Sequence, residues 1–220
     1  MEFLIKITDR LRNFSDCVEV IQKQANGVVL GEYKMSLNDI INSLTNSSTE
    51  GSTHETPFLP KNCVKLVSTI NGHEVFIELP KRKWQITYGN DTITVGFPRM
   101  IFAYKVHGKS ISKLRIIALK ESGALNGETP IYYFPFANVY HTTAEVCMGG
   151  NVFPEIECLS LLEKMHYLFF AAPFNDDYGS ISTETKTMKQ LIESLKDKEF
   201  NDDLLMPMNT TINGFFHLSK

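Results

Sequence analysis

The stretch MIFAYKV at residues 100–106 and the stretch LRIIAL at residues 114–119 are the most apolar strand-length segments of the chain. Aliphatic and aromatic side chains of this kind are enriched in strands, and a near-continuous apolar run is typical of a strand covered on both faces. Gly108 lies between the two stretches and favours a turn. We therefore predict that they form neighbouring strands at the centre of a sheet.

Shorter strand-like segments lie on both sides of this pair. They are residues 63–70, 74–79, 84–88, 92–95 and 131–134. Asn71-Gly72 joins the first two segments and is a strong signal for a two-residue hairpin turn. Pro135 ends the last segment, because proline cannot donate a hydrogen bond to a neighbouring strand. The order of these segments predicts an antiparallel β-meander.

Helical spacing replaces strand patterning in the C-terminal part of the chain. Residues 155–170 carry apolar side chains every three or four positions, and Pro154 suits the start of a helix. A last helix is expected to reach Lys196, with Ser182 or Thr183 as its N-cap. Strands followed by helices predict the α+β class.

The N-terminal part predicts three strands and one helix. The strands are expected at residues 3–8, 17–22 and 28–34, where apolar and polar side chains alternate, with Asn26-Gly27 as a hairpin turn. Ser36 is the candidate N-cap of a short helix that follows. This part therefore predicts a small sheet with one helix over residues 37–44.

Residues 45–56 contain no aliphatic or aromatic side chain, so we expect a flexible loop there. We therefore predict a β-rich extension at residues 1–56, a core at residues 57–205 and a tail at residues 206–220. A separate lobe that docks a partner and a plain extension of the sheet are both open interpretations of the N-terminal extension.

Composition excludes several classes of function. A net charge of −3 over 220 residues gives no electrostatic reason to expect nucleic acid or an anionic membrane as the main partner. No apolar run approaches the ~20 residues that a spanning helix needs, and the charged N-terminus lacks the features of a signal peptide. The four cysteines show neither a CxxC pair nor zinc-ligand spacing. We therefore expect no metal or cofactor, a reducing cytoplasm, and core positions for Cys17, Cys63 and Cys158.

The stretch FPFANVYHTTAEVCMGG at residues 134–150 contains the candidate site. Cys147 lies between an irregular polar segment and a glycine pair, where a thiol can stay accessible and react as the thiolate. Asn138 can donate a hydrogen bond to a developing oxyanion. His141 can lower the pKa of the thiol or accept a proton. Together these residues indicate acyl transfer with a cysteine nucleophile.

Each of these residues also has a structural interpretation. Cys147 can be a buried cysteine at a strand end, Asn138 can hold the loop through its side chain, and His141 can be a surface residue. The acidic residues 176–177 can guide an acceptor amine or lie in a solvated turn. The aromatic residues 132–136 can form a partner surface, or they can pack the sheet against the helices.

The spacing of Asn138 and Cys147 resembles the active-site segment of ubiquitin-conjugating enzymes, in which a His-Pro-Asn triplet precedes the catalytic cysteine. Here the triplet reads Phe136-Ala137-Asn138, so the asparagine is kept while the histidine and the proline are not. The wider pattern is similar to the prokaryotic ubiquitin-conjugating-like family D, also called the PRTRC-system protein B family. The stretches that carry this similarity are Phe97-Pro98, residues 129–132, 135–139 and 146–149, and Phe169-Phe170.

The resemblance covers most of residues 60–174 and implies a ubiquitin-conjugating (UBC-like) fold for the core. It implies that Cys147 carries a bacterial ubiquitin-like protein as a thioester and passes it to an acceptor. The companions it implies are a ThiF-like activating enzyme, a ubiquitin-like modifier and a JAB-type metalloprotease.

Two other classes of function remain open from the sequence. A degenerate UBC-like module can bind a ubiquitin-like partner without chemistry, because the His and Pro of the triplet are missing. A Cys–His hydrolase can combine Cys147 with His141 or His166, although no orienting third residue is evident.

Overall fold

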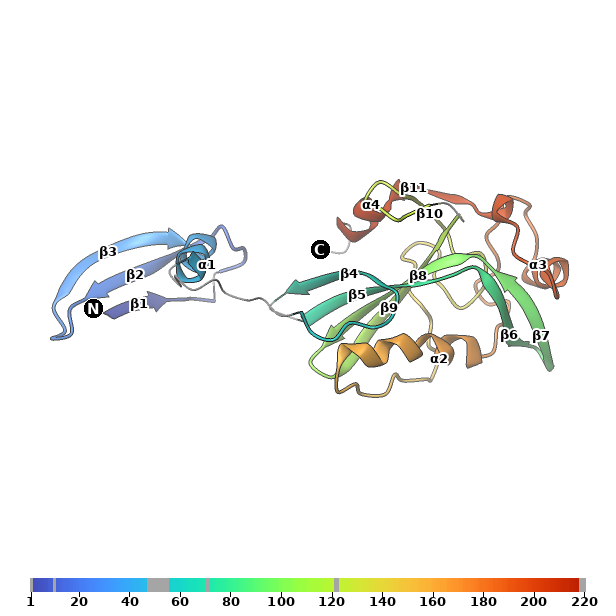
Figure 1. Cartoon of the computed structure of the whole chain (residues 1–220), viewed down its shortest axis with the longest axis horizontal. Coiled ribbons are helices and arrows are strands. Elements are labelled where there is room, and N and C mark those ends of the chain that lie inside the picture. The colour runs from blue at the N-terminus through green and yellow to red at the C-terminus, as the bar shows by residue number, and fades with distance from the viewer. Residues whose placement is uncertain (1, 10, 47–55, 70–71, 121–122, 218–220) are drawn as a thin grey trace. The chain divides into compact units, whose positions relative to one another are not determined.

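The computed structural model describes residues 2–9, 11–46, 56–69, 72–120 and 123–217. The chain divides into two compact units, residues 1–55 and 56–220, and each is described by itself (Figure 1). The loop predicted at residues 45–56 lies almost entirely outside the described residues.

The first unit is an antiparallel sheet of three strands with one helix. Its order is β1 (Glu2–Lys6), β2 (Cys17–Lys23) and β3 (Val29–Ser36), followed by α1 (Leu37–Asn46). Ser36 Oγ accepts a hydrogen bond from the backbone N–H of Asp39 at 3.0 Å, which satisfies a free donor of the first helical turn. The predicted sheet, helix and cap are confirmed.

The second unit is built on an antiparallel sheet of six strands. They are β4 (Cys63–Thr69), β5 (Gly72–Leu79), β8 (Arg99–His107), β9 (Ser110–Leu119), β10 (Pro130–Tyr132) and β11 (Pro207–Thr211), in the order β11-β10-β9-β8-β5-β4. The predicted central pair is β8 and β9, with Ile101 opposite Ile117. The antiparallel meander and the mixed α and β content are therefore confirmed.

The central strands are covered on both faces, which explains their near-continuous apolar sequence. Phe102 and Ile116 pack in the large core with the helices, whereas Ile101 and Ile117 point into a second core on the other face. The second core also contains Ala144 from the candidate site loop. This loop is therefore anchored on the sheet.

The hairpin of β5 and β8 continues into a separate two-stranded sheet of β6 (Arg82–Tyr88) and β7 (Asp91–Phe97). Pro80 and Pro98 lie at the two junctions, between the pairs Leu79–Met100 and Arg82–Phe97. Proline lacks an N–H, so the ladder is interrupted there and the hairpin bends (Figure 1).

The helix predicted over residues 155–170 begins later than expected. Residues 155–158 are not helical, and a 3₁₀ helix, η1 (Leu159–Lys164), precedes α2 (His166–Ala171). The backbone N–H of Ile156 donates to the carbonyl of Lys109 at 2.8 Å, which holds that segment against the turn between β8 and β9. Apolar residues three positions apart suit a 3₁₀ helix as well as an α-helix, so the spacing did not separate the two.

The last predicted helix is present as α3 (Met188–Leu195), but its N-cap was predicted wrongly. Thr187 caps it in a capping box with Gln190, whereas Thr183 donates its hydroxyl to the carbonyl of Asp203 at 2.8 Å. The tail carried no usable pattern, yet it forms η2 (Asp202–Leu204), β11 and α4 (Ile212–His217).

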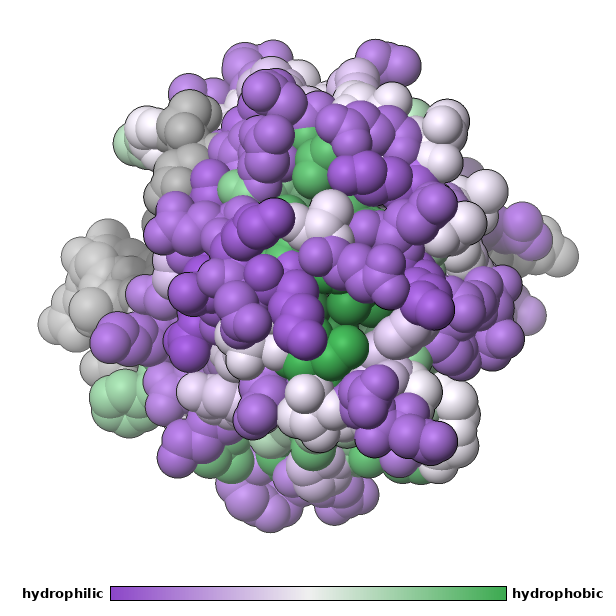
Figure 2. Space-filling model, turned by 90° about the vertical axis from the view of Figure 1, so that its right-hand side faces the viewer, coloured by the Kyte–Doolittle hydropathy of each residue, from purple (hydrophilic) through white to green (hydrophobic). Residues whose placement is uncertain are grey.

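Aromatic side chains fill the large core. Phe136 is fully buried and lies 4.2 Å from Phe97 between ring centres, and Phe134 is also buried. These two rings therefore pack the sheet against the helices, which was the structural interpretation of this cluster. The face shown in Figure 2 is largely hydrophilic, with apolar atoms visible in a central strip and along the lower edge.

The core positions predicted for two cysteines were wrong. Cys17 and Cys158 are exposed, and Cys63 is half-buried. Cys17 lies at the start of β2 on the exposed side of a small sheet, and Cys158 precedes the first turn of η1. All four cysteines are free.

We predict that Gly96→Ala lowers the free energy of unfolding of the second unit by ~1–3 kcal/mol, because overpacking forces the backbone to shift. A Cβ at Gly96 in β7 would lie 2.6 Å from the backbone nitrogen of Phe200 and 2.8 Å from the carbonyl carbon of Glu199. Urea unfolding followed by the fluorescence of Trp84, the chain's one tryptophan, measures this change. Gly150→Ala is the control, since no atom lies within 4 Å of its Cβ. Equal midpoints for the two variants would contradict the prediction.

Candidate functional site

Asn138 and Cys147 lie opposite each other across a short hairpin. The backbone N–H of Cys147 donates to the carbonyl of Asn138 at 2.8 Å, and Val139 pairs with Val146 in an antiparallel bridge. Ala144 in the turn has φ = 56°, the left-handed conformation that reverses the chain. The structure therefore brings together two of the three residues predicted for the site.

The second strand of this hairpin is held by β9. Ile116 donates its N–H to the carbonyl of Ala144 at 2.8 Å, and Val146 donates to the carbonyl of Leu114 at 2.9 Å. Cys147 is the first residue beyond this pairing. The pairing with β9 positions the residue, and because Cys147 is only half-buried, its thiol is still reachable from solvent.

The side chain of Asn138 is directed at the end of α2. Its Nδ2 donates to the carbonyl oxygen of Pro173 at 3.0 Å, and the residue is 6% exposed. Its backbone has φ = 67°, a conformation that asparagine tolerates better than most residues. This contact is the one that a loop-holding role requires, and it occupies one amide hydrogen.

Two tyrosines complete the surroundings of the thiol. The hydroxyl of Tyr178, in the segment between α2 and α3, donates to Cys147 Sγ at 3.5 Å. It lies 2.9 Å from the hydroxyl of Tyr140, and the two rings meet edge to face with centres 4.6 Å apart. A hydroxyl has one hydrogen, so Tyr140 donates to Tyr178 when Tyr178 donates to the sulfur. The result is a chain of donors that ends at the thiol.

This environment favours the thiolate. The pKa of Cys147 is lowered chiefly by the hydrogen bond from Tyr178, then by the backbone N–H of Gly149 and by Tyr140. Partial burial and the negative charge of Asp177 oppose the shift but do not cancel it. The same hydrogen bonds raise the pKa of Tyr178, so the phenol stays protonated and remains a donor at neutral pH.

Unlike Asn138 and Cys147, His141 forms no hydrogen bond that ties its ring to the site among the residues that the structure describes. Its Nε2 is buried and has no hydrogen-bond partner among the residues that the structure describes. Burial lowers the pKa of His141, so the ring is neutral at pH 7, and it is not among the groups that shift the pKa of Cys147. A role for His141 as the proton acceptor stays a prediction.

The two acidic residues after α2 have separate partners. Asp176 accepts a hydrogen bond from the hydroxyl of Tyr88 at 2.9 Å. Asp177 accepts one from Asn175 Nδ2 at 2.8 Å, and its charge acts on Cys147. Of the two, Asp177 is therefore the acidic side chain whose charge acts on the thiol.

Tyr140 and Tyr178 were missed by the sequence prediction. Tyr140 lies in the quoted stretch but carries no motif, and Tyr178 follows Cys147 by 31 residues. Only its position next to the acidic pair could have drawn attention to it.

Within the described residues, no group of three or more His, Cys, Asp or Glu side chains is arranged to hold a metal ion. The helices of the described part include none with the length and apolar character that crossing a membrane requires.

These features define a mixed α and β protein in which a hairpin held by β9 presents a hydrogen-bonded cysteine. The family model described as prokaryotic E2 family D matches residues 36–208, so the chain belongs to this family. The match includes the whole candidate site and begins at the last residue of β3 in the first unit. No curated protein and no solved structure matches the chain.

We predict that Tyr178→Phe slows alkylation of Cys147 by iodoacetamide at pH 7 by roughly threefold to tenfold, since loss of a hydrogen bond to a charged group leaves less thiolate. The rate profile should also shift to higher pH. Mass spectrometry of the peptide that contains Cys147 separates its rate from those of the exposed Cys17 and Cys158. Tyr167→Phe is the matched control, and equal rates in both variants would rule out the tyrosine effect.

For Asn138 we predict that alanine destabilises the second unit more than glycine does. Both substitutions remove the hydrogen bond to Pro173, but only alanine strains the left-handed backbone, by about 1 kcal/mol. Urea unfolding of Asn138→Ala and Asn138→Gly measures the difference. If both variants unfold like the unaltered chain, Asn138 does not hold the loop.

Proposed function

We propose that this protein carries a ubiquitin-like protein as a thioester on Cys147 and passes it to an acceptor, on a UBC-like core. The observation that carries the proposal is the hydrogen bond from Tyr178 to the sulfur, because it favours the nucleophilic form of a reachable thiol. Membership of the prokaryotic E2 family supports the class of partner, a ubiquitin-like protein.

Loading is an exchange of one thioester for another. The Cys147 thiolate attacks the carbonyl carbon of the modifier's C-terminal thioester on an activating enzyme, and the activating enzyme's cysteine leaves as a thiolate. The two thioesters have similar energies, so positioning, thiolate access and oxyanion stabilisation are sufficient. A ThiF-like activating enzyme, and a JAB-type metalloprotease for removal, remain proposed partners in a bacterial cytoplasm.

Tyr178 is a second candidate donor for the oxyanion, and it is better placed than Asn138. As the sulfur becomes acylated it loses its negative charge and is a weaker hydrogen-bond acceptor. The hydroxyl of Tyr178 can then donate to the adjacent carbonyl oxygen instead. Asn138 has one amide hydrogen committed to Pro173 and is buried, so it reaches the oxyanion only with its second hydrogen. We assign Asn138 first to holding the loop and second to the oxyanion.

A cleft beside the cysteine suits the extended tail of a modifier. It has a volume of about 180 Å³, and its lining includes Lys113, Glu145, Met148 and Phe153. Lys113 and Glu145 pair with each other at 2.8 Å on its rim. Met148 directly follows the nucleophile, so a tail in this cleft would lead to the thiol.

The alternative is a UBC-like module that binds a ubiquitin-like partner without chemistry. It is favoured by Phe136, which stands where ubiquitin-conjugating enzymes have histidine and is fully buried. A Cys–His hydrolase has less support. Within the described residues, neither His141 nor His166 forms a hydrogen bond with Cys147, and His166 packs against Trp84 at 5.5 Å between ring centres.

The test combines the protein with an activating enzyme, its ubiquitin-like protein and ATP, followed by a non-reducing gel. For the unaltered protein we expect a new band that thiol reductant removes. The band should be absent in Cys147→Ala. In Cys147→Ser it should persist in reductant, because the serine forms an oxyester. Cys158→Ser is the matched control, because Cys158 is also a free, exposed thiol. Tyr178→Phe should form the band several-fold more slowly.

A band that survives Cys147→Ala would move the carrier role to another residue. Non-covalent capture of the modifier by the unaltered protein, with no band and no alkylation of Cys147, would favour the binding module.

A further inference from the structure

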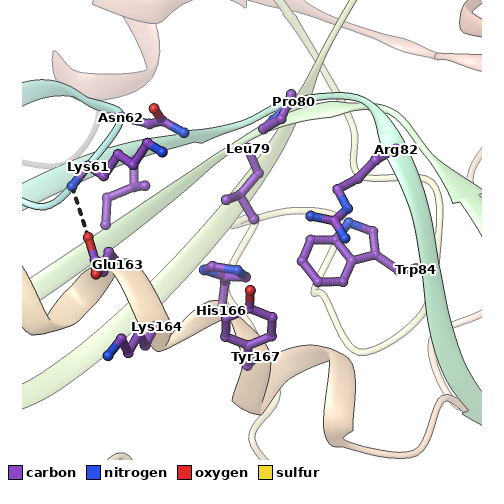
Figure 3. A pocket seen from close by; sticks show the side chains of 11 residues that line it. Lys61, Asn62, Leu79, Pro80, Arg82, Trp84, Glu163, Lys164, His166 and Tyr167 are labelled. Atoms are coloured by element: carbon purple, nitrogen blue, oxygen red, sulfur yellow. Dashed lines mark hydrogen bonds between the residues drawn. The ribbon is translucent and has the colours of Figure 1, made fainter.

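A pocket of about 340 Å³ lies between the bend of the β5–β6 chain and the η1–α2 segment (Figure 3). This volume is within the range of sites for small organic ligands, ~300–1,000 Å³. Ile77, Leu79 and Pro80 supply an apolar wall, whereas neither Cys147 nor Tyr178 lines the pocket. The pocket therefore has no part in the proposed thioester chemistry.

Positive side chains outnumber negative ones among the residues that line this pocket. Lys61, Arg82 and Lys164 line it, against one carboxylate, that of Glu163. The Glu163 carboxylate accepts a hydrogen bond from the backbone N–H of Lys61 at 3.5 Å, and it offsets one of the three positive charges. Among the described residues, none of these three cations forms a salt bridge. A pocket with excess positive charge attracts an anion.

Arg82 is held in place by an aromatic stack. Its guanidinium carbon lies 4.2 Å from the centre of the Trp84 ring, and Phe170 stacks on the other side of the indole at 4.1 Å with an interplanar angle of 6°. Stacking orients the guanidinium and leaves its N–H edge available for the oxygens of an anion. Figure 3 shows the guanidinium over the indole at one end of the pocket and Lys61 at the other.

A buried ring nitrogen in the pocket wall lacks a partner. It is Trp84 Nε1, and its residue is 7% exposed. It is without a hydrogen bond in the part of the chain that the structure describes, and such a buried polar group destabilises a fold unless something satisfies it. An indole nitrogen can only donate, so the matching ligand atom is an acceptor such as a phosphate or carboxylate oxygen.

We propose that this pocket binds a small organic anion, whose phosphate or carboxylate group is held by Arg82 and whose apolar part lies against Leu79 and Pro80, while Lys61 and Lys164 add to the positive charge that attracts it. The apolar wall is the reason to expect an organic anion instead of an inorganic one. An anion bound to Arg82 lies beside the indole, so binding changes the surroundings of Trp84.

Trp84 is the only tryptophan in the chain, so its fluorescence reports on this pocket directly. The experiment titrates the full-length protein with phenyl phosphate and with benzoate, which share a ring and differ in the anionic group, at constant ionic strength. We expect a saturable change with one of them. In Arg82→Gln the affinity should fall roughly tenfold, as for loss of one charge-assisted contact, and in Lys61→Gln and Lys164→Gln it should fall by a smaller factor.

Lys83→Gln is the matched control, because Lys83 is exposed, adjacent in sequence and bonded through Nζ to the carbonyl of Asp197 at 3.3 Å. Saturation by phenyl phosphate alone supports a phosphate ester as the natural ligand class, and saturation by benzoate alone supports a carboxylate. A response that never saturates, or one that Lys83→Gln weakens as much as the pocket variants do, would overturn the proposal. Circular dichroism checks that each variant is folded.

Discussion

The position of Cys147 depends on backbone hydrogen bonds between its own hairpin and the centre of the sheet. Ala144 and Val146 bond with Ile116 and Leu114 of β9, a strand that is itself paired with β8 and β10. Cys147 thus belongs to a loop in sequence but is held by the core in space. The proposed transfer of an acyl group needs this combination, because a nucleophile must be precise in position while its surroundings stay open.

A second constraint comes from the segment that follows α2. Asn138 holds its start at Pro173, and the backbone N–H of Phe174 donates to the carbonyl of Thr87 at 2.8 Å. These two contacts tie the segment to the site hairpin on one side and to β6 on the other. Tyr178 reaches the sulfur because the chain before it is fixed at both points. The buried asparagine therefore acts on the site even where it does not touch a reacting atom.

The parts of the fold that local chemistry decides were predictable from the sequence. The central strands and the helix capped by Ser36 are of this kind, because their patterns have one good structural solution. The start of η1 and the Thr187 cap were not predictable. Spacing by three positions fits two kinds of helix, and Thr183 was an equally good cap until its hydroxyl bonded to Asp203. In these cases, contacts with distant segments decide between local alternatives.

The same division applies to the site. Asn138 and Cys147 are nine residues apart, so a hairpin brings them together and the motif suffices to pair them. Tyr178 comes from a segment that no local pattern connects to the cysteine. Phe136 shows that the motif alone does not describe the surroundings of the cysteine. It stands at the histidine position of the triplet, and its ring lies 4.2 Å from that of Phe97 in the core. A polar group there would be buried without a partner. In this chain the hydrogen bond to the sulfur comes from Tyr178, on a different segment.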